Sequence, residues 1–426
     1  MTGYKFVHAA DLHLDSPFRG RLRDASSLGP ALRDATFRAY ESIIDLCIEE
    51  GVDALLIAGD VYDGAASSLG AQLRFKDGLQ RLEEAGIRAF VCHGNHDPLD
   101  GWKAKITFPP NVVRFGKEVS GVPFNPDDPS SPMVYGISYP TRDVQENLVS
   151  RFPAPESGRY CIGLLHANVG TDTGHESYAP CSLGDLVETG YDYWALGHVH
   201  TRAVLHRANP VVAYPGNPQG RHINEDGERG IYVVEVDGHG GTELEFRSLE
   251  AIRWDRIDVG IEDIKDEQAL LDTVDENVQG ALRKAKGSPL LYRLRFRGRG
   301  AVHATLARPG FIGDVRADVN NRFAVGAGFA FCESIEDDSS SEVDAEELRK
   351  GADFLGDLLR LIDGAADADG DTDLKESLLA ELSTLYEHRI VGRYLGLDAR
   401  DALNFDELLA HAERILIDEL VDGRRD

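Results

Sequence analysis

Arg88-Ala-Phe-Val-Cys92, followed at once by His93-Gly94-Asn95-His96-Asp97, decides how the rest of the chain is interpreted. An apolar run of this length predicts a buried strand, and polar side chains follow directly at its end. The same order recurs where other apolar runs meet short polar motifs, at Lys5–Ala10, Asp53–Ala58, Cys161–Leu165 and Tyr191–Leu196. Helical periodicity separates the first three runs, and in open α/β sheets ligands bind at the carboxyl ends of the strands. The first 250 residues therefore predict an α/β fold with one polar edge.

The motifs that close these five strands supply seven side chains of metal-binding type: Asp11, His13, Asp60, Asn95, His166, His198 and His200. Carboxylate and imidazole together suit manganese, iron or zinc, and no thiolate competes with them. Two metal ions about 4 Å apart can clamp the attacking and the leaving oxygen of a phosphoryl group. Each motif alone is a weak signal, because an Asp after a strand usually caps a helix or a turn. Five motifs, each closing a predicted strand, indicate a two-metal hydrolytic site.

The chemistry of the residues assigns roles within this site. Asp60 is the best candidate for a carboxylate that bridges two cations, and the neutral oxygen of Asn95 keeps the site's charge low enough to admit a phosphodiester. Asp11 and His13 can turn toward one ion only if the backbone bends between them. A water shared by two cations loses a proton easily and becomes the nucleophile.

His96 is the candidate catalytic residue, because it neighbours the ligand Asn95 and is itself followed by Asp97. An imidazole supported by a carboxylate can stabilise the transition state or protonate the leaving oxygen. We therefore expect His96 and Asp97 to act together in catalysis.

The composition is that of a globular protein with two or three domains. The chain has 426 residues, of which 42% are hydrophobic. No apolar run approaches the roughly 18 residues of a membrane span, and the N-terminus does not follow the pattern of a signal peptide. The five cysteines are odd in number and scattered, which is typical of a reducing, cytoplasmic setting.

The net charge of −28 is unusual for a protein that binds nucleic acid. The uneven distribution of this charge weakens the argument against nucleic-acid binding. Residues 333–426 carry 27 acids and 10 bases and therefore most of the excess of acidic residues. An acidic protein can still bind DNA through a local Arg patch or divalent metals, since the local potential governs phosphate binding.

From about residue 210 the pattern changes to consecutive strands. Val211–Tyr214, Gly230–Val236 and Glu243–Phe246 are joined by Gly-rich turns and are predicted to form a second sheet. A helix is predicted over Glu267–Lys286, and the acidic segment 334–347 predicts a flexible linker. Amphipathic stripes beyond it predict a helical tail, at Leu374, Leu378, Leu379, Leu382, Leu385 and Tyr386, and at Phe405, Leu408, Leu409, Ala412, Ile415 and Leu416.

Four arginines alternate along one predicted strand: Arg293, Arg295, Arg297 and Arg299. On a strand they would share one face at intervals of about 7 Å. That spacing suits successive phosphates of a nucleic acid. The alternative is a solvated face paired with acids of neighbouring strands, such as Asp255 and Asp258 or Glu262, and the sequence does not separate the two.

The motifs resemble those of the calcineurin-like metallophosphoesterases. Four of them are similar to the SbcD-type DNA-repair exonucleases: Ala10-Asp11-Leu12-His13, Gly59-Asp60-Val61-Tyr62-Asp63, Gly94-Asn95-His96-Asp97 and Gly197-His198-Val199-His200. The stretch from Tyr214 to Gly230 resembles the YhaO-type bacterial branch. The phosphoesterase motifs cover about residues 1–235, and the chain past residue 255 matches only in general layout.

The resemblance implies two ligand sets for two divalent ions, with Mn²⁺ as the working metal. One set is Asp11, His13, Asp60 and His200, and the other is Asp60, Asn95, His166 and His198. It also implies that His96 is the catalytic histidine and that Asp97 orients it.

The resemblance further implies an architecture. A two-sheet β-sandwich metallophosphoesterase core flanked by helices would span residues 1–253, followed by a small α/β capping and DNA-binding domain over 254–333. The acidic linker would occupy 334–347, and the helical C-terminal region 348–426 would dock an ATPase.

The leading hypothesis is a manganese-dependent DNA nuclease, an exonuclease with single-strand endonuclease activity, in DNA repair. The implied partners are DNA, an SMC-like coiled-coil ATPase of the SbcC-like or YhaN-like kind, and a second copy in a homodimer. One alternative is a phosphoesterase of a small phosphomonoester or cyclic nucleotide. Another is a non-catalytic structural subunit of the ATPase complex.

Overall fold

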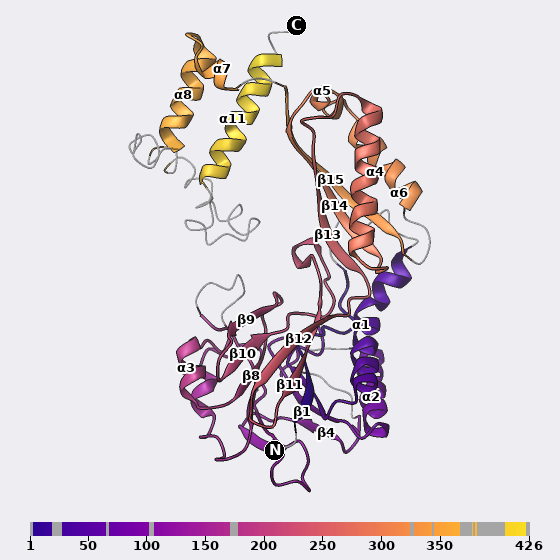
Figure 1. Cartoon of the computed structure of the whole chain (residues 1–426), viewed down its shortest axis with the longest axis vertical. Coiled ribbons are helices and arrows are strands. Elements are labelled where there is room, and N and C mark those ends of the chain that lie inside the picture. The colour runs from indigo at the N-terminus through magenta and orange to yellow at the C-terminus, as the bar shows by residue number, and fades with distance from the viewer. Residues whose placement is uncertain are drawn as a thin grey trace. The chain divides into compact units, whose positions relative to one another are not determined.

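The computed structural model describes residues 3–18, 28–64, 68–101, 106–170, 178–323, 328–342, 345–366, 377, 380 and 405–422. They fall into two compact units, which are described separately (Figure 1). The first holds Met1–Ile257, Val278–Arg293 and Asp318–Ser334. The second holds Asp258–Asn277, Leu294–Ala317 and Ile335–Asp426.

The first sheet of the larger unit has the strand order β12-β11-β1-β2-β3-β4. Its strands are β1 (Tyr4–Ala9), β2 (Ala54–Ala58), β3 (Arg88–Cys92), β4 (Val112–Arg114), β11 (Gly230–Val236) and β12 (Thr242–Ser248). Strands β1 to β4 run parallel, because the helices α1 (Gly29–Glu50) and α2 (Leu69–Glu84) form the crossovers between the first three. Both helices pack on one face of this sheet, where their apolar stripes are buried against Val7, Leu55 and Val91.

The second sheet has the order β5-β6-β7-β8-β10-β9. Its strands are β5 (Ser120–Pro123), β6 (Met133–Gly136), β7 (Cys161–His166), β8 (Tyr193–Gly197), β9 (Ala203–His206) and β10 (Val211–Tyr214). The inner faces of the two sheets form one apolar core that includes Phe6, Leu56, Phe90, Ile162 and Tyr193. The short elements η2 (Leu148–Arg151), α3 (Leu183–Glu188) and η3 (Ile223–Glu225) complete this unit. The predicted two-sheet sandwich with flanking helices is confirmed.

One strand assignment was wrong. Only β10 of the three runs beyond residue 210 lies in the second sheet, whereas β11 pairs with β1 and β12 pairs with β11 in the first. The runs themselves are strands, as predicted. Local alternation identifies a strand, but it does not identify a pairing partner more than 200 residues away.

A third sheet has the order β13-β14-β15, with β13 (Arg253–Gly260), β14 (Leu290–Arg299) and β15 (Ala330–Ser340). The helices α4 (Glu267–Lys284), α5 (His303–Leu306) and α6 (Phe311–Phe323) lie between these strands in the chain. Strand β15 corrects the predicted linker over residues 334–340. Its acids are strand residues because arginines of β14 neutralise them, as Arg295 does for Asp338.

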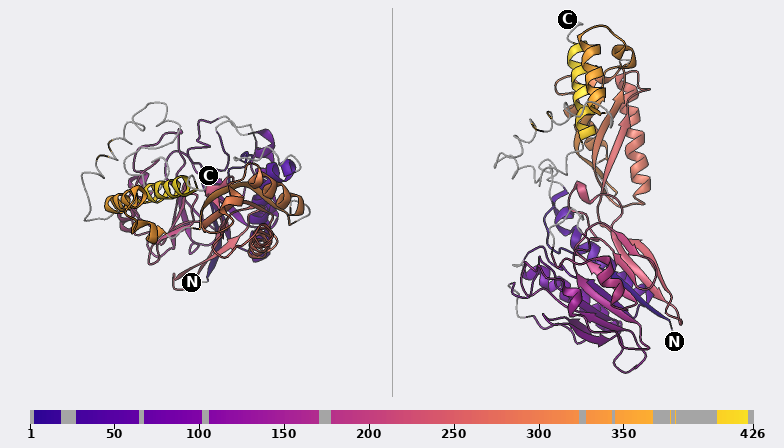
Figure 2. Two further views of the ribbon diagram at one scale, coloured as in Figure 1. Left: turned by 90° about the horizontal axis from the view of Figure 1, so that it is seen from above. Right: turned by 90° about the vertical axis from the view of Figure 1, so that its left-hand side faces the viewer.

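The described part of the tail contains α7 (Ala345–Arg349), α8 (Phe354–Ala366) and α11 (Phe405–Asp422). Figure 2 shows α8 and α11 side by side, and Leu355, Leu359 and Ile417 are buried together between them. The predicted stripe from Leu374 to Tyr386 lies outside the described residues. None of the described helices combines the length and apolar composition that a membrane span requires.

His8 links the two sheets inside the sandwich core. Its Nδ1 lies 2.9 Å from the Tyr193 hydroxyl and its Nε2 lies 3.1 Å from the Leu196 carbonyl oxygen. The carbonyl can only accept, so Nε2 carries the proton and Nδ1 accepts from the phenol. Burial lowers the pKa of His8 to about 3, and the ring is therefore neutral in the folded protein.

We predict that His8 makes the fold acid-labile. Below the ordinary histidine pKa of 6.5 the unfolded chain takes up a proton that the folded chain excludes down to about pH 3. This costs about 1.4 kcal/mol of unfolding free energy per pH unit as the pH falls. Urea unfolding in chelator at pH 6 and pH 4 should show the same loss in the wild type and in His239→Gln, a surface control, and a smaller loss in His8→Gln, where the buried His13 still contributes. Equal pH slopes in all three proteins would refute the assignment.

Candidate active site

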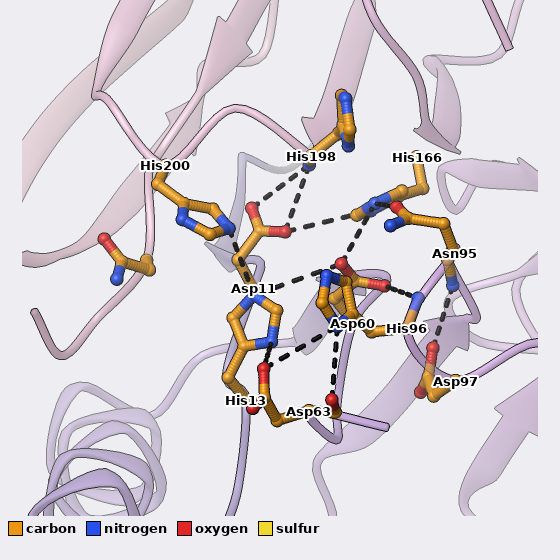
Figure 3. A network of polar contacts seen from close by, with 12 residues as sticks. Asp11, His13, Asp60, Asp63, Asn95, His96, Asp97, His166, His198 and His200 are labelled. Carbon is orange, nitrogen blue, oxygen red and sulfur yellow. Dashed lines mark hydrogen bonds and ion pairs between the residues drawn. The ribbon is translucent and has the colours of Figure 1, made fainter. Parts of the chain in front are cut away.

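The five polar motifs meet because their strands end at the same edge of the sandwich. Strands β1, β2 and β3 are parallel neighbours in the first sheet, and β7 and β8 are parallel neighbours in the second. Figure 3 shows the seven predicted ligand residues gathered in one place, with Asp63 and His96 beside them. The predicted polar edge is therefore present, and the packing of the two sheets brings its two halves together.

The backbone bends sharply at four of the candidate ligands. The φ angles of Asp11, His13 and Asp60 are 52°, 43° and 49°, and that of His198 is 103°. The left-handed region costs an L-residue about 1–2 kcal/mol, and such residues collect at functional sites. The bend expected between Asp11 and His13 is present. Backbone hydrogen bonds hold it, from the Asp11 N–H to Gly59 O at 3.1 Å and from the His13 N–H to Asp60 O at 3.0 Å.

One group of donors is centred on His166. Its Nδ1 lies 2.9 Å from the Ala58 carbonyl oxygen, to which it donates, so its Nε2 faces the other donors. This Nε2 lies 3.0 Å from Asn95 Oδ1 and 3.4 Å from Asp60 Oδ2, and Asp11 belongs to the same group. Burial opposes protonation of the ring, but the Asp60 and Asp11 carboxylates outweigh it and raise the pKa of His166 to about 9. The carboxylates therefore stabilise a positive charge in this pocket, and a divalent cation can supply it in place of the proton.

A second group joins Asp11, His13 and His200. The Nε2 atoms of the two imidazoles face each other at 3.1 Å. His200 Nδ1 lies 2.8 Å from Glu225 Oε1, and His13 Nδ1 lies 3.3 Å from Asp63 Oδ1. Carboxylates behind the outer nitrogens keep the protons there and leave the inner lone pairs for a metal. Burial also lowers the pKa of His13 to about 3, so the ring is neutral, as a ligand must be.

These two groups have Asp11 in common, and Asp60 lies between their imidazoles, which fits a pair of neighbouring divalent cations. Asp60 Oδ2 lies 3.4 Å from His166 Nε2 and 4.0 Å from His13 Nε2, which belong to different groups. Burial opposes ionisation of Asp60, but His166 and the neighbouring imidazoles hold its pKa well below the usual range. An ionised carboxylate between the imidazoles of two clusters is the arrangement that a bridging ligand requires.

His198 reaches the site in a different way from the other six residues. Its backbone N–H donates to both oxygens of Asp11 at 3.1 Å, and its ring packs edge-on against His166 with centroids 5.2 Å apart. Among the described residues, the groups of three or more donors within 4.8 Å do not include its imidazole. The main chain of His198 therefore positions Asp11, and its ring must rotate to act as a ligand.

His96 has a different carboxylate partner from the one predicted. Its Nδ1 lies 3.2 Å from the Asp63 carbonyl oxygen and 3.6 Å from Asp63 Oδ1. Its side chain is 32% exposed and is therefore accessible to a substrate. The prediction that Asp97 orients His96 is wrong, because adjacent residues of this turn point in different directions. Asp63 was visible in the motif Gly59–Asp63, but no role was predicted for it.

Asp97 instead shapes the loop that carries Asn95 and His96. Its carboxylate is buried, accepts from the backbone N–H groups of Gly94 at 2.9 Å and Val61 at 3.1 Å, and lies 2.8 Å from His93 Nδ1. This carboxylate ties the β3 loop to the β2 loop, so Asp97 is a positioning residue.

Sequence reasoning also missed Glu225 and Arg221. Both lie in the stretch from Tyr214 to Gly230 that carries the YhaO-type resemblance, which was the available signal. His222, in the same stretch, accepts from the Asn224 N–H at 3.2 Å at the start of η3, so it has a turn role.

The alternating arginines of β14 have partners within their own sheet. Three pair with carboxylates on neighbouring strands: Arg293 with Glu333 at 3.1 Å, Arg295 with Asp338, and Arg297 with Asp258 at 3.4 Å. Gly298 has a φ of 88°, which interrupts the alternation before Arg299. These contacts favour the ion-paired face over a row of phosphate contacts.

Two glycines of the motifs have no side chain where the metal-ligand candidates lie. A Cβ at Gly59 would overlap the His166 ring, and a Cβ at Gly94 would overlap Asp60 Oδ1 and lie 2.6 Å from His166 Nε2.

We predict that Gly94→Ala folds but binds Mn²⁺ at least about tenfold more weakly, because the methyl group displaces two ligands. Titration calorimetry can compare it with Gly116→Ala, where the added Cβ meets no atom within 4 Å. Wild-type affinity in Gly94→Ala would contradict this reading of the site.

Comparison with known proteins agrees with the geometry. The calcineurin-like phosphoesterase family profile matches residues 4–202, and the profile of the middle domain of metallophosphoesterase YhaO matches residues 254–340. The chain is 36% identical over 367 residues to the uncharacterized metallophosphoesterase YhaO of Bacillus subtilis (strain 168), covering 85% of this chain and 88% of that protein.

Two more distant relatives are a DNA repair protein and a nuclease subunit. The chain is 28% identical over 233 residues to the DNA double-strand break repair protein Mre11 of Sulfurisphaera tokodaii, covering 52% of this chain and 57% of the relative. It is 23% identical over 283 residues to one of the subunits of the nuclease SbcCD of Bacillus subtilis (strain 168), covering 58% of this chain and 69% of the relative. With these relatives and this site, the chain belongs to the calcineurin-like metallophosphoesterases, within them to the YhaO family, and is a metal-dependent phosphodiesterase or nuclease.

Proposed function

We propose that the chain is a manganese-dependent DNA nuclease that acts in DNA repair as an exonuclease with single-strand endonuclease activity. The observation that carries the proposal is the convergence of carboxylate, amide and imidazole donors on two adjoining clusters that have Asp11 in common, with Asp60 Oδ2 within 4.0 Å of an imidazole of each. The names of the Mre11 and SbcCD relatives support a DNA substrate. The donor set contains oxygen and imidazole nitrogen without thiolate, which supports manganese.

The proposed ligands divide into two sets. Asp11, His13, Asp60 and His200 hold one ion, and Asp60, Asn95, His166 and His198 hold the other. When bound, the two ions supply an acidified water and charge stabilisation for the displaced oxygen. Asp60 belongs to both proposed sets and so keeps the two ions close together. The buried Asp11 is held in place by the His198 N–H.

His96 completes the proposed chemistry. Asp63 accepts at the Nδ1 side of its ring, so the Nε2 side is directed away from that partner. From there the half-buried imidazole can stabilise the transition state or give a proton to the leaving oxygen. The five cysteines are free and buried, which supports a reducing compartment such as the cytoplasm.

We predict that His96→Ala separates binding from chemistry. The variant should keep both manganese ions and lose DNA cleavage by about 10²–10⁴-fold, the usual contribution of a general acid or base. His166→Ala, the matched control, should lose a metal as well as activity. Labelled linear DNA, a chromogenic diester and a chromogenic monoester are the substrates. Near-normal turnover of DNA by His96→Ala would remove the assignment, and a wild type that cleaves only the monoester would support the small-molecule alternative.

We also propose that the tail docks the coiled-coil base of an SMC-like ATPase. On α8 the exposed fractions of Phe354 and Leu361 are 69% and 53%, while Leu355 and Leu359 are buried against α11. Short helices need an apolar partner surface for most of their stability, and the exposed Phe354 and Leu361 offer one. A homodimer is the other proposed assembly, with exposed Leu69 and Leu73 on α2 as its candidate surface.

We predict that Leu361→Glu abolishes co-purification with the co-expressed ATPase, because it places a charge in the docking face. DNA cleavage and melting temperature should not change. Ile48→Glu carries the same substitution to an exposed apolar position on α1 and should leave capture intact. Undiminished capture by Leu361→Glu would exclude this face.

A further inference from the structure

Two charged residues of the stretch before β11 are buried beside the metal-ligand candidates. The exposed fractions of Arg221 and Glu225 are 8% and 3%. Charged residues are seldom buried unless they are paired, and a buried pair often contributes little net stability compared with apolar residues of similar volume. The position of this pair therefore calls for an explanation beyond the fold.

Glu225 stands directly behind one candidate ligand. Its Oε1 lies 2.8 Å from His200 Nδ1, and its Oε2 accepts from the Arg221 backbone N–H at 2.7 Å. Arg221 Nη2 also lies 3.4 Å from His200 Nδ1. The shorter contact decides the tautomer, because the carboxylate can only accept and so fixes the proton on Nδ1.

Arg221 extends the contact to a second carboxylate. Its Nη2 lies 3.2 Å from Glu225 Oε1 and its Nη1 lies 2.9 Å from Asp63 Oδ1. Asp63 Oδ1 in turn lies 3.3 Å from His13 Nδ1 and 3.6 Å from His96 Nδ1. One guanidinium thus bridges the two carboxylates that stand behind three imidazoles, two of them facing each other through Nε2 at 3.1 Å.

We infer that Arg221 and Glu225 are positioning residues that set the orientation of His200 directly and of His13 and His96 through Asp63. They couple one of the two cation sites to the catalytic histidine. The other proposed site has a different support, because the His166 proton is held by the Ala58 carbonyl. The inference rests on the two-metal site of the proposed function and is independent of whether DNA is the substrate.

The test replaces Arg221 and Glu225 together, so that neither charge stays buried without its partner. Replacing a buried ion pair by apolar residues of similar volume is often neutral or stabilising, so Arg221→Met combined with Glu225→Met should keep the melting temperature. Loss of an outer partner of a metal-binding histidine costs about 10–100-fold in metal affinity. Manganese titration followed by electron paramagnetic resonance should therefore show one ion weakened by that factor and the other unchanged.

Two further variants separate positioning from general packing. Arg253→Met with Glu250→Met removes another buried Arg–Glu pair of the same unit and should bind both ions as the wild type does. Glu225→Gln keeps an oxygen that can accept from His200 Nδ1 and should restore most of the lost affinity. With a chromogenic diester at saturating manganese, the double variant should lower kcat with little change in KM, because the Asp63 carboxylate beside His96 loses its Arg221 partner.

The inference is overturned if the Arg221 and Glu225 double variant binds both ions with wild-type affinity, or if the control double variant weakens them equally. It is also overturned if Glu225→Gln binds no better than the double variant. If the wild type binds two ions, none of these results affects the proposed function. A wild type that binds fewer than two ions removes both.

Discussion

Everything in the larger unit depends on holding acceptors close together in a place where water cannot separate them. Asp11, Asp60 and the imidazoles of His13 and His166 share a volume that is almost closed to solvent, and His200 lies at its edge. Such an arrangement is unfavourable unless positive charge lies among the acceptors. The rest of the molecule can be understood as the support for it: bent backbone at Asp11 and Asp60, glycines where side chains would collide, and carboxylates behind the rings.

The sequence predicted the centre of this arrangement well and its periphery poorly, for a physical reason. Each motif is local, because a buried strand followed by a polar residue is visible within about ten residues. Strand β3 begins and ends as predicted at Arg88 and Cys92, and six of the seven predicted ligand side chains enter the two clusters. What surrounds a ligand is not local. Glu225 stands behind His200, and the YhaO-type stretch around it marks the segment but not the residue or its partner.

The same distinction explains the errors. Asp97 follows His96 in the chain but bonds to His93 and to the backbone of two loops, since a tight turn separates the side chains of adjacent residues. The acidic run after Glu333 has the composition of a linker, yet it is a strand because the arginines of β14 offset its charge. Composition describes a segment in isolation, whereas strand formation depends on what the neighbouring strand presents. Part of the acidic content of the chain is therefore ion-paired within the third sheet.

The placement of β1 has a consequence for how the protein is made. This strand is the first to be synthesised, yet in the sheet it lies between β2 and β11, so one of its edges stays open until residues 230–236 arrive. Loop-closure entropy makes such distant pairings slow. Asp11 likewise waits for the His198 N–H, which is 187 residues away. Throughout synthesis of the first 200 residues the nascent chain carries an unfinished sheet edge and unsatisfied metal-seeking side chains. The first sheet and the catalytic centre both stay incomplete until these distant segments have been made.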